Sequence, residues 1–437
     1  MEDQIIVFGR NDVEQLALSN RSSKCLPTLL DFKSNAKAFP YLQEGIKTIH
    51  QGGNRMAILT HQNNLLLTLH DYKMHSKSSS SSSTLEHHNK ASIDVPSHDI
   101  CLLRNNVIDV AVGFSHCLFL TKQHELYGFG NTSNGRIGIS NEQMMDNEDA
   151  IITNTFKRLY NIKCFQVPLS HLMDEDEFIT SIYALGQGTI CKTNRENLIT
   201  FGWNYRGELC SQVKSDRQSP KKITFFNSSI IDGIYTGYSH VMFLVNKRTD
   251  IKLYVCGWNE LGQLGLGHNS NVFSITENEF CTFKHDIVDI SLGYDFSMFL
   301  TRQGKVYGCG KLPSPPSDTI KYFGAFYEFK LDGITQITCG YYHALFVVNH
   351  KQIIACGSND CFQCGFSDED ETNYGISNCR PLNITNPLPL RLLSAGQYCS
   401  AILFSFGQVK YEAEKRMKER LLRAFEESKL IDIIILR

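Results

Sequence analysis

Residues 253–265 read LYVCGWNELGQLG, and this stretch decides the fold. An apolar strand ends in a glycine, an asparagine follows two residues later, and GQLG makes a turn. Glycine permits a positive φ where strand becomes turn, and the asparagine side chain can cap that turn. We name this the strand-turn pattern. It occurs seven times: after Gly9, Gly130, Gly202, Gly257, Gly310 and Gly357, and in a worn copy at 65–70 that lacks its glycine.

A second pattern alternates with the first along the chain. In this glycine-histidine pattern, a glycine is followed by two variable residues, often a histidine, and an apolar run. The clearest copies are GFSHCLFLT at 113–121, GYSHVMFL at 237–244 and GYYHALFV at 340–347. Looser copies begin at Gly52, Gly186, Gly293 and Gly396, which again makes seven. We expect these glycines to let backbones crowd near a narrow centre.

The order of the two patterns predicts a closed ring. The chain begins with the strand-turn pattern, IIVFGRNDVEQL at 5–16, and ends near Gly396 with the other, so a half-repeat is left at each end. In an open stack both halves would be exposed strand edges, whereas in a ring they complete one blade. The spacing from Gly52 to Gly396 averages about 57 residues, which suits a four-stranded blade with its loops. We therefore expect an all-β, seven-bladed propeller over 1–405, whose N-terminal strands complete the last blade.

Two segments lack the repeat. Residues 73–98 contain a run of serines and cannot bury a core, so we expect a disordered insertion, either passive or phosphorylated. In the tail, 406–437, an amphipathic helix is expected at 411–427 because Met417, Leu421 and Phe425 form one apolar stripe. It either packs on the propeller or binds a partner. The last residues, LIDIIILR, read as an apolar strand.

Composition excludes several classes of function. The net charge of −2 and the pI near 6.7 give no general cationic surface, so neither nucleic acid nor a membrane is an expected partner. The N-terminus lacks a secretory signal and no apolar run approaches the length of a spanning helix. We expect a soluble, cytoplasmic protein, with the nucleus as a second location. The acidic stretches 142–149, 174–177 and 368–371 are expected to be solvated loops.

No catalytic, cofactor or metal motif is evident. The chain lacks GxxxxGK[ST], GxSxG and HExxH motifs, so we expect no enzyme activity and no cofactor. The fifteen cysteines, Cys256 among them, are expected to be free and mostly buried in strands. The one CxxC, at 361–364, has no second pair at zinc spacing, so no metal is expected.

The glycine-x-x-histidine motif followed by LYxxGxNxxGQLG resembles the regulator of chromosome condensation repeat, and the resemblance extends from Ile5 to about Phe404. This family forms seven-bladed propellers, and its best-known member is an exchange factor for the small GTPase Ran. In that member, the residues that carry the exchange activity are mainly acidic residues and histidines. The resemblance implies that the corresponding positions in this chain lie just after the glycines of the glycine-histidine pattern. The tail here is faintly similar to the entrance of a BTB domain, which would imply a ubiquitin-ligase component as partner. A light-sensing relative depends on many tryptophans, whereas this chain has two.

The corresponding positions here are aromatic and supply one carboxylate, so an exchange site is mostly absent. We predict that they bind a protein partner: Phe114, Tyr238, Tyr294, Asp295, Tyr341, Tyr342 and Tyr398. The rings either pack over the channel mouth or form an interface hot spot. Other repeat residues are predicted to be structural, the histidines through a hydrogen bond rather than catalysis: Gly113, His116, Gly237, His240, Gly257, Gly340, His343 and Gly357.

Two functions follow. The first is a non-enzymatic interaction platform or adaptor, in ubiquitin or small-GTPase regulation. The alternative is a guanine-nucleotide exchange factor.

Overall fold

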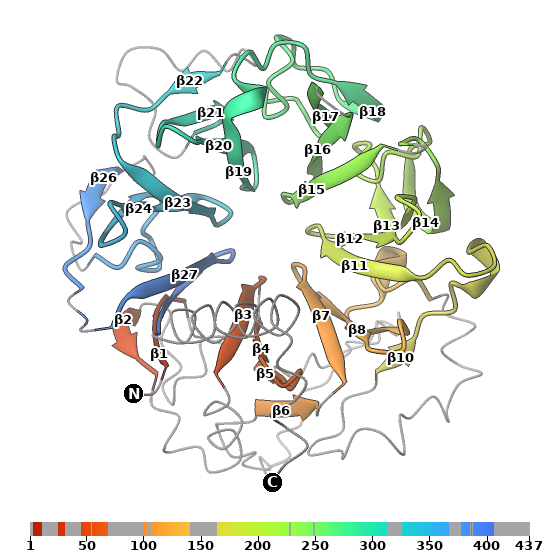
Figure 1. The fold of residues 1–437 in the computed structure, drawn as a ribbon, viewed down its shortest axis with the longest axis horizontal. Coiled ribbons are helices and arrows are strands. Elements are labelled where there is room, and N and C mark those ends of the chain that lie inside the picture. The colour runs from red at the N-terminus through yellow and green to blue at the C-terminus, as the bar shows by residue number, and fades with distance from the viewer. Residues whose placement is uncertain are drawn as a thin grey trace, which may run out of the picture.

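The chain folds into seven four-stranded antiparallel sheets arranged around an axis as the blades of a propeller (Figure 1). The computed structural model describes residues 3–10, 25–30, 45–53, 55–68, 100–103, 106–139, 164–226, 229–247, 250–312, 326–366, 377–384, 386 and 388–405. The predictions for 73–98 and for 406–437 lie outside them. Within these ranges, no helix has the length and apolar character needed to cross a bilayer. The predicted fold is confirmed.

Blades 1 to 6 follow the chain, each built outward from the axis in sequence order. Blade 1 contains β3 (Ile46–Gln51), β4 (Met56–Thr60), β5 (Leu65–Thr68) and β6 (Ile100–Leu103). Blade 2 contains β7 (Val107–Val112), β8 (His116–Thr121), β9 (Leu126–Gly130) and β10 (Phe165–Gln166). Blade 3 contains β11 (Ile179–Ala184), β12 (Gly188–Thr193), β13 (Leu198–Asn204) and β14 (Ser215–Ile223). Blade 4 contains β15 (Ile230–Thr236), β16 (His240–Lys247), β17 (Asp250–Gly257) and β18 (Val272–Glu277).

The remaining blades complete the ring. Blade 5 contains β19 (Ile287–Leu292), β20 (Phe296–Thr301), β21 (Val306–Gly310) and β22 (Tyr327–Glu328). Blade 6 contains β23 (Ile334–Cys339), β24 (His343–Val348), β25 (Gln352–Gly357) and β26 (Ser377–Pro381). Blade 7 is β27 (Leu390–Ala395), β28 (Cys399–Phe404), β1 (Gln4–Gly9) and β2 (Cys25–Leu29). Within the described residues, short 3-10 helices lie in three loops: η2 (Ser133–Gly135), η3 (Ser170–Leu172) and η4 (Lys284–Asp286).

Blade 7 joins the two ends of the described chain, as the pattern order predicts. β1 pairs with β28 along its whole length, from Gln4 opposite Phe404 to Gly9 opposite Cys399. The backbone N–H of Arg10 extends this ladder by donating to the carbonyl oxygen of Tyr398 at 2.7 Å. The N-terminal strands therefore occupy the third and fourth positions of a blade whose first two strands are C-terminal.

The core is a ring of separate apolar clusters rather than one centre. Each of seven clusters combines side chains from two adjacent blades, including the pair formed by blades 7 and 1. Second strands such as β8 and β20 are buried at all six positions because a blade lies against each of their faces. This explains why they read as continuous apolar runs rather than as alternating strands.

Backbone hydrogen bonds link the blades near the axis. At every interface an N–H of one blade donates to a carbonyl of the next, over 2.9–3.3 Å. The donors and acceptors are Gly53 to Gly113, Phe114 to Gly186, Gly186 to Tyr238, Tyr238 to Gly293, Tyr294 to Tyr341, Tyr341 to Gly396 and Gln397 to Gly52. The pattern glycines permit this close approach: a Cβ on Gly237 would lie 2.7 Å from the carbonyl oxygen of Gly293.

The copy at Gly186 is shifted by one position relative to the register expected from the sequence. The N–H of Leu185 donates to the carbonyl of Gly188, as Gly113 does to His116. Leu185 therefore occupies the pattern glycine's place and Gly188 the histidine's. The loop still contains a glycine, Gly186, but one residue later, and this hides the shift from a pattern search.

The strand-turn pattern behaves as its chemistry predicts. Gly257 and Gly357 both have φ +109°, a region that other residues rarely adopt. The Asn259 carboxamide accepts from the N–H of Leu264 at 2.9 Å and donates to the carbonyl of His268 at 2.7 Å. These bonds fix the GQLG turn against its strand.

Two expectations from the sequence are wrong. Cys256 is not a free thiol, because it forms a disulfide with Cys210, which links β17 of blade 4 to the turn that follows β13 in blade 3. Nor is 174–177 merely a solvated loop. The buried Glu177 carboxylate accepts from Lys222 at 2.6 Å, from Thr193 at 2.7 Å and from Asn197 at 2.8 Å. Burial alone would raise its pKa, but these donors and the N–H of Asp174 lower it to about 2.

Candidate functional site: an aromatic face over the channel

Two sets of loops meet at one end of the ring. In six described blades, the residue after the strand-turn glycine donates its N–H to a carbonyl in the glycine-histidine loop, at 2.7–3.0 Å. These bonds join Arg10 to Tyr398, Asn131 to Ser115, Trp203 to Gln187, Trp258 to Ser239, Lys311 to Asp295 and Ser358 to Tyr342. The repeat therefore builds two concentric rings of residues on one face.

The inner ring brings most of the predicted partner-binding residues together. We name this cluster the crown: Phe114, Tyr238, Tyr294, Tyr341, Tyr342 and Tyr398. Tyr238 stacks on Tyr294 with centroids 4.3 Å apart, and Tyr342 lies 5.2 Å from Tyr294. All six rings are partly exposed. Edge and stacked contacts of this kind contribute about 0.5–1.5 kcal/mol per pair beyond area burial.

The crown crosses the axis of the propeller. Phe114 of blade 2 and Tyr341 of blade 6 are stacked with centroids 6.3 Å apart, although other blades separate them on either side of the ring. Tyr341 also meets Tyr238 at 5.3 Å and Tyr294 at 5.6 Å. The rings therefore cover one mouth of the channel, and the residues that bear them are half-buried. The packing and the hot-spot interpretations are compatible, because the same rings can do both.

Glycines of the preceding blade support the crown from below. A Cβ on Gly186 would collide with the ring of Tyr238, and one on Gly53 would lie 3.0 Å from Cδ2 of Phe114. The Gln187 side chain then fixes Tyr238 by donating to its hydroxyl at 2.9 Å. These glycines set the tilt of the rings as well as the backbone approach.

The hydroxyls of Tyr294, Tyr341 and Tyr342 remain protonated near neutral pH. Burial raises the pKa of Tyr294, and Arg206 offsets part of that rise. Burial and then the neighbouring tyrosines hold the pKa of Tyr341 and of Tyr342 well above the ordinary value. The crown therefore offers neutral hydrogen-bond donors on apolar rings, a combination enriched at protein interfaces.

Asp295 differs from the other predicted partner-binding residues. It is only 5% exposed, and burial raises its pKa to about 6, with Lys311 acting in the opposite direction. It is therefore buried, close enough to Tyr342 to affect the pKa of that hydroxyl, rather than on the surface. The one carboxylate in the glycine-histidine loops is not presented to a partner in this conformation.

A row of aromatic and basic side chains, which the sequence did not reveal, extends the crown outward over blade 3. Lys214 lies 3.5 Å above the ring of Tyr205, which stacks on Trp203. Arg206 lies 4.0 Å above Trp258 and 5.8 Å from Trp203, and Trp258 meets Tyr294 edge-on at 5.6 Å. Each cation-π contact contributes about 0.5–2 kcal/mol. The Gly-Trp-Asn triplets were visible in the sequence, but their proximity to the crown follows only from the loop-to-loop hydrogen bonds.

A buried carboxyl group fixes the start of this row. Glu208 is 1% exposed and accepts from the backbone N–H of Arg206 at 2.8 Å. Burial raises its pKa to about 7, against the lowering effect of nearby backbone donors and Arg206. Its counterparts in other blades are the glutamines Gln263 and Gln363, whose side-chain oxygens accept from the N–H groups of Leu261 and Cys361.

The repeat histidines join blades and take no part in the face. His116, His240 and His343 are fully buried. Nε2 of His240 lies 3.0 Å from Oγ of Ser297 in the next blade, and that hydroxyl donates to the carbonyl of Gln263 at 2.6 Å. The same relay runs from His343 through Ser400 to Gln363, and from His116 through Thr189 to Arg136. Burial lowers the pKa of each imidazole to about 3, so all three are neutral.

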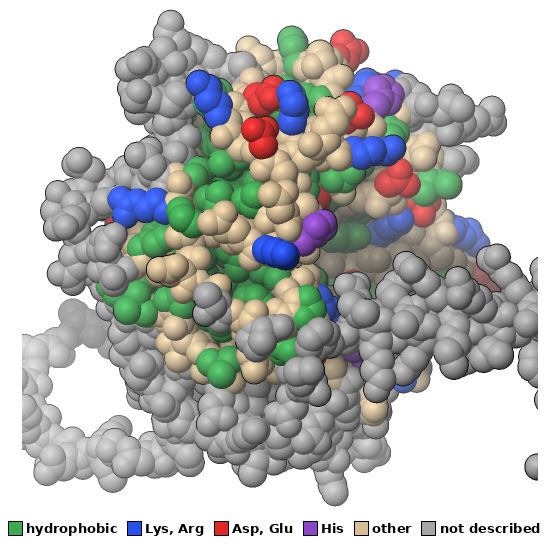
Figure 2. Space-filling model, turned by 60° about the vertical axis from the view of Figure 1, so that its left-hand side comes forward, with side chains coloured by type: hydrophobic (Ala, Val, Ile, Leu, Met, Phe, Trp, Pro, Cys, Tyr) green, Lys and Arg blue, Asp and Glu red, His purple; other side chains and the backbone are tan. Residues whose placement is uncertain are grey.

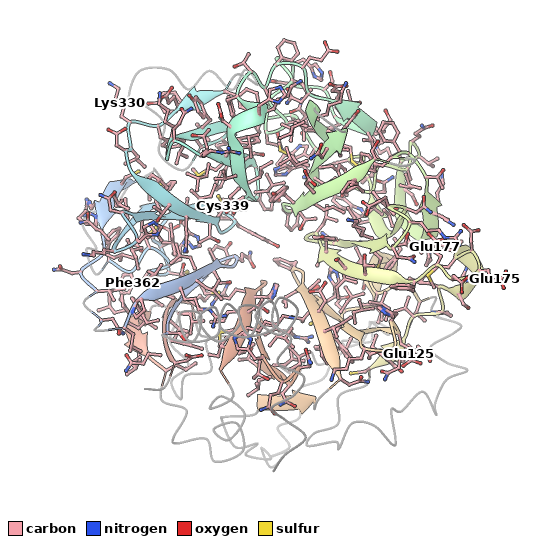
Figure 3. The ribbon with its side chains drawn as sticks, viewed as in Figure 1. Glu125, Glu175, Glu177, Lys330, Cys339 and Phe362 are labelled. Atoms are coloured by element: carbon pink, nitrogen blue, oxygen red, sulfur yellow. A yellow bond between two sulfur atoms is a disulfide. The ribbon has the colours of Figure 1, made fainter. Side chains whose placement is uncertain are left out.

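The visible surface is mixed in charge. Figure 2 shows basic and acidic side chains interspersed among hydrophobic ones, without a large area of one sign on the part that is coloured. The acidic residues Glu125, Glu175 and Glu177 lie toward the periphery, whereas Cys339 lies at the inner end of β23 near the axis (Figure 3). Within the described ranges, no group of three or more histidine, cysteine or acidic side chains is placed to hold a metal ion.

Comparison with known proteins identifies the repeat. The family model for the regulator of chromosome condensation (RCC1) repeat matches residues 252–300, and a second model of the same repeat matches 107–136 and 334–363. Among solved structures, Prp20p of Saccharomyces cerevisiae superposes with a TM-score of 0.67 at 14% identity, covering 96% of this chain and 95% of Prp20p. At this identity the likeness shows the fold alone.

Two curated relatives match part of the chain. The ultraviolet-B receptor UVR8 of Arabidopsis thaliana is 24% identical over 295 residues, covering 66% of this chain and 62% of the receptor. The secretion-regulating guanine nucleotide exchange factor of Bos taurus is 33% identical over 114 residues, covering 26% of this chain and 24% of that protein. The chain thus spans less than two thirds of the length of either relative.

Proposed function

Because this chain is an RCC1-like seven-bladed propeller, we propose that it is a non-enzymatic protein-interaction platform and that the crown is its docking surface. The observation that carries the proposal is the convergence of six partly exposed rings, from blades 2, 4, 5, 6 and 7, on one mouth of the channel. Rigid aromatic side chains with a polar end lose little entropy on binding and dominate interface energetics.

The row over blade 3 supports the same function. Tyr205 is 45% exposed and Val213 is 57% exposed, next to the cations Arg206 and Lys214. An apolar centre with a polar and charged rim is the usual anatomy of an interface. The proposed footprint therefore runs from the crown outward over blade 3.

Relatives carrying this repeat support an interaction or exchange-factor-like role and do not specify the partner. Prp20p, which shares the fold, binds Gsp1p and histones. For this chain we propose a protein partner, either a small GTPase or a ubiquitin-ligase component.

Exchange activity is the second candidate, favoured by the match to the secretion-regulating exchange factor. Buried Asp295 would have to become accessible before it could contact a nucleotide-binding protein. Release of labelled GDP from a panel of small GTPases tests this candidate directly. Acceleration by the propeller would favour exchange, and its absence across the panel would remove this candidate.

Affinity purification with mass spectrometry tests the docking surface. The double variant Tyr205→Ser/Tyr342→Ser removes one ring from the row and one from the crown. Its matched control is Ile230→Ser, because Ile230 is 61% exposed and begins β15 at the opposite end of blade 4 from Tyr238. We expect the double variant to lose the main partner while the control retains it. If the double variant is folded and still captures that partner, the crown is not the docking surface.

A further inference from the structure

Two cations are held on aromatic rings in the row over blade 3. Nζ of Lys214 lies 3.5 Å from the centre of the Tyr205 ring, and the guanidinium of Arg206 lies 4.0 Å from the centre of the Trp258 ring. The two sites adjoin, because Tyr205 stacks on Trp203 and Arg206 also lies 5.8 Å from the Trp203 ring. A cation that is already positioned on a ring loses less conformational entropy on binding than one on a freely rotating side chain.

The positive charge of the row is only partly offset by carboxylates. Among the side chains that the structure describes, none forms an ion pair with Arg206 or Lys214. Two carboxyl groups lie near Arg206, those of Glu208 and Glu260. Glu208 is buried, so a partner cannot reach it, whereas Glu260 is exposed. The described part of the row therefore presents two cations and one accessible carboxylate, a local excess of positive charge on a chain whose net charge is −2.

Carboxylate side chains complement this arrangement better than nucleobases do. Lys214 and Arg206 each occupy a face of an aromatic ring, where a base would have to stack. Ammonium and guanidinium groups donate strong, charge-assisted hydrogen bonds to carboxylates. Laid end to end, the contacts from Lys214 through Tyr205 and Trp203 to Arg206 place the two cations at most about 15 Å apart. An extended segment of about five residues spans that distance.

We propose that the row over blade 3 binds a segment of the protein partner that carries at least two aspartate or glutamate side chains within about five residues. The acidic segment belongs to the partner that docks on the crown, so its assignment rests on the proposed function. Tyr205 and Val213 are exposed next to the cations and provide apolar surface for a residue between the acidic ones.

Selection of a random peptide library, displayed on phage, on the full chain tests the proposal. We expect the enriched peptides to carry clustered aspartate or glutamate, and a fluorescent copy of one of them to bind Arg206→Gln/Lys214→Gln about tenfold more weakly than the wild type. Replacing the acidic residues of that peptide by asparagine and glutamine should weaken its binding to the wild-type chain as much, a measurement that needs no variant of the protein.

The matched control is Lys122→Gln/Lys330→Gln. It removes the same charge from exposed lysines that follow β8 and β22, at the end of their blades opposite the crown, and should bind the peptide as the wild type does. Enrichment without acidic residues, equal binding by Arg206→Gln/Lys214→Gln, or recovery of no peptide would overturn the proposal. So would binding of oligothymidylate that is lost in the same variant while acidic peptides fail to bind.

Capture of the main partner separates this proposal from the proposed function. If Tyr205→Ser/Tyr342→Ser loses that partner while Arg206→Gln/Lys214→Gln retains it, the crown remains the docking surface and the acidic segment is wrong. If both double variants retain it, the docking surface itself is wrong.

Discussion

The histidine relays between blades predict a specific loss of stability in mild acid. His240 is fully buried, and its Nε2 faces the hydroxyl of Ser297 in the next blade. Its ring also lies against Gly237, where an added Cβ would be 2.5 Å from Cε1 of the imidazole. There is no room for water to hydrate a charged ring. Protonation must therefore occur mainly in the unfolded chain.

The magnitude follows from the two pKa values. Burial lowers the pKa of His240 from 6.5 to about 3. Between pH 7 and pH 5 the unfolded chain binds a proton at His240 that the folded chain does not. The contribution of the neutral His240 to the free energy of unfolding is therefore present above pH 6.5 and is lost as the pH falls below it. At 1.36 kcal/mol per pKa unit, the loss over this interval is about 2 kcal/mol for one histidine.

Urea unfolding of wild type and His240→Gln at pH 7, 6 and 5 isolates this contribution. The free energy of unfolding of the wild type should fall by about 2 kcal/mol more than that of the variant, which has nothing to titrate at this position. Ser297→Ala is the control: it removes the two neutral hydrogen bonds that this hydroxyl makes with His240 and Gln263, about 1 kcal/mol each, and should keep the wild-type pH dependence. Parallel pH profiles for wild type and His240→Gln would refute the buried, neutral histidine.

Three further predictions concern other parts of the ring. Gly186→Ala should displace the Tyr238 ring and destabilise the fold by about 1–3 kcal/mol, measured by urea unfolding, with weaker partner capture; an unchanged midpoint would contradict the steric argument. Lys222→Met should lower the free energy of unfolding by about 2 kcal/mol at pH 7, because the Glu177 carboxylate loses its charged donor. Since the pKa of Glu177 is lowered in the folded protein, the stabilisation by the ion pair is present above pH 4.5 and is lost as the pH falls toward 2. An acid unfolding profile identical to that of the wild type would argue against the ion pair. Removing residues 1–10 should abolish cooperative unfolding, because β28 loses β1; a sharp transition at the wild-type midpoint would show that blade 7 does not close the ring.

The fold could be predicted because the order of the two sequence patterns along the chain indicates that the blades form a closed ring. The strand around Ile5 and the loop at Gly396 are each half of a unit, and no arrangement other than a ring gives both a neighbour. The positive φ of Gly257 and Gly357 could also be predicted from the sequence, because this backbone conformation depends only on the residue itself and the turn that follows it.

The site was only partly predictable because its geometry depends on contacts between blades. The crown residues occupy the two repeat positions that follow the pattern glycine, so their convergence followed from the fold. The burial of Asp295 did not, because burial depends on how the loops of neighbouring blades pack around a side chain, which the repeat pattern does not encode. The Cys210–Cys256 disulfide and the stacking of Arg206 on Trp258 also join different blades, and no local pattern encodes either contact.

Hydrogen exchange of the chain alone and in complex with its captured partner tests the docking surface most directly. We expect protection to appear in the loops at 113–115, 237–239, 293–295, 340–342 and 396–398 and in 203–214, while the strand starts at the opposite mouth, such as 230–232, exchange as before. Protection confined to that opposite mouth, with the crown loops unchanged, would contradict the assignment of the crown as the docking surface.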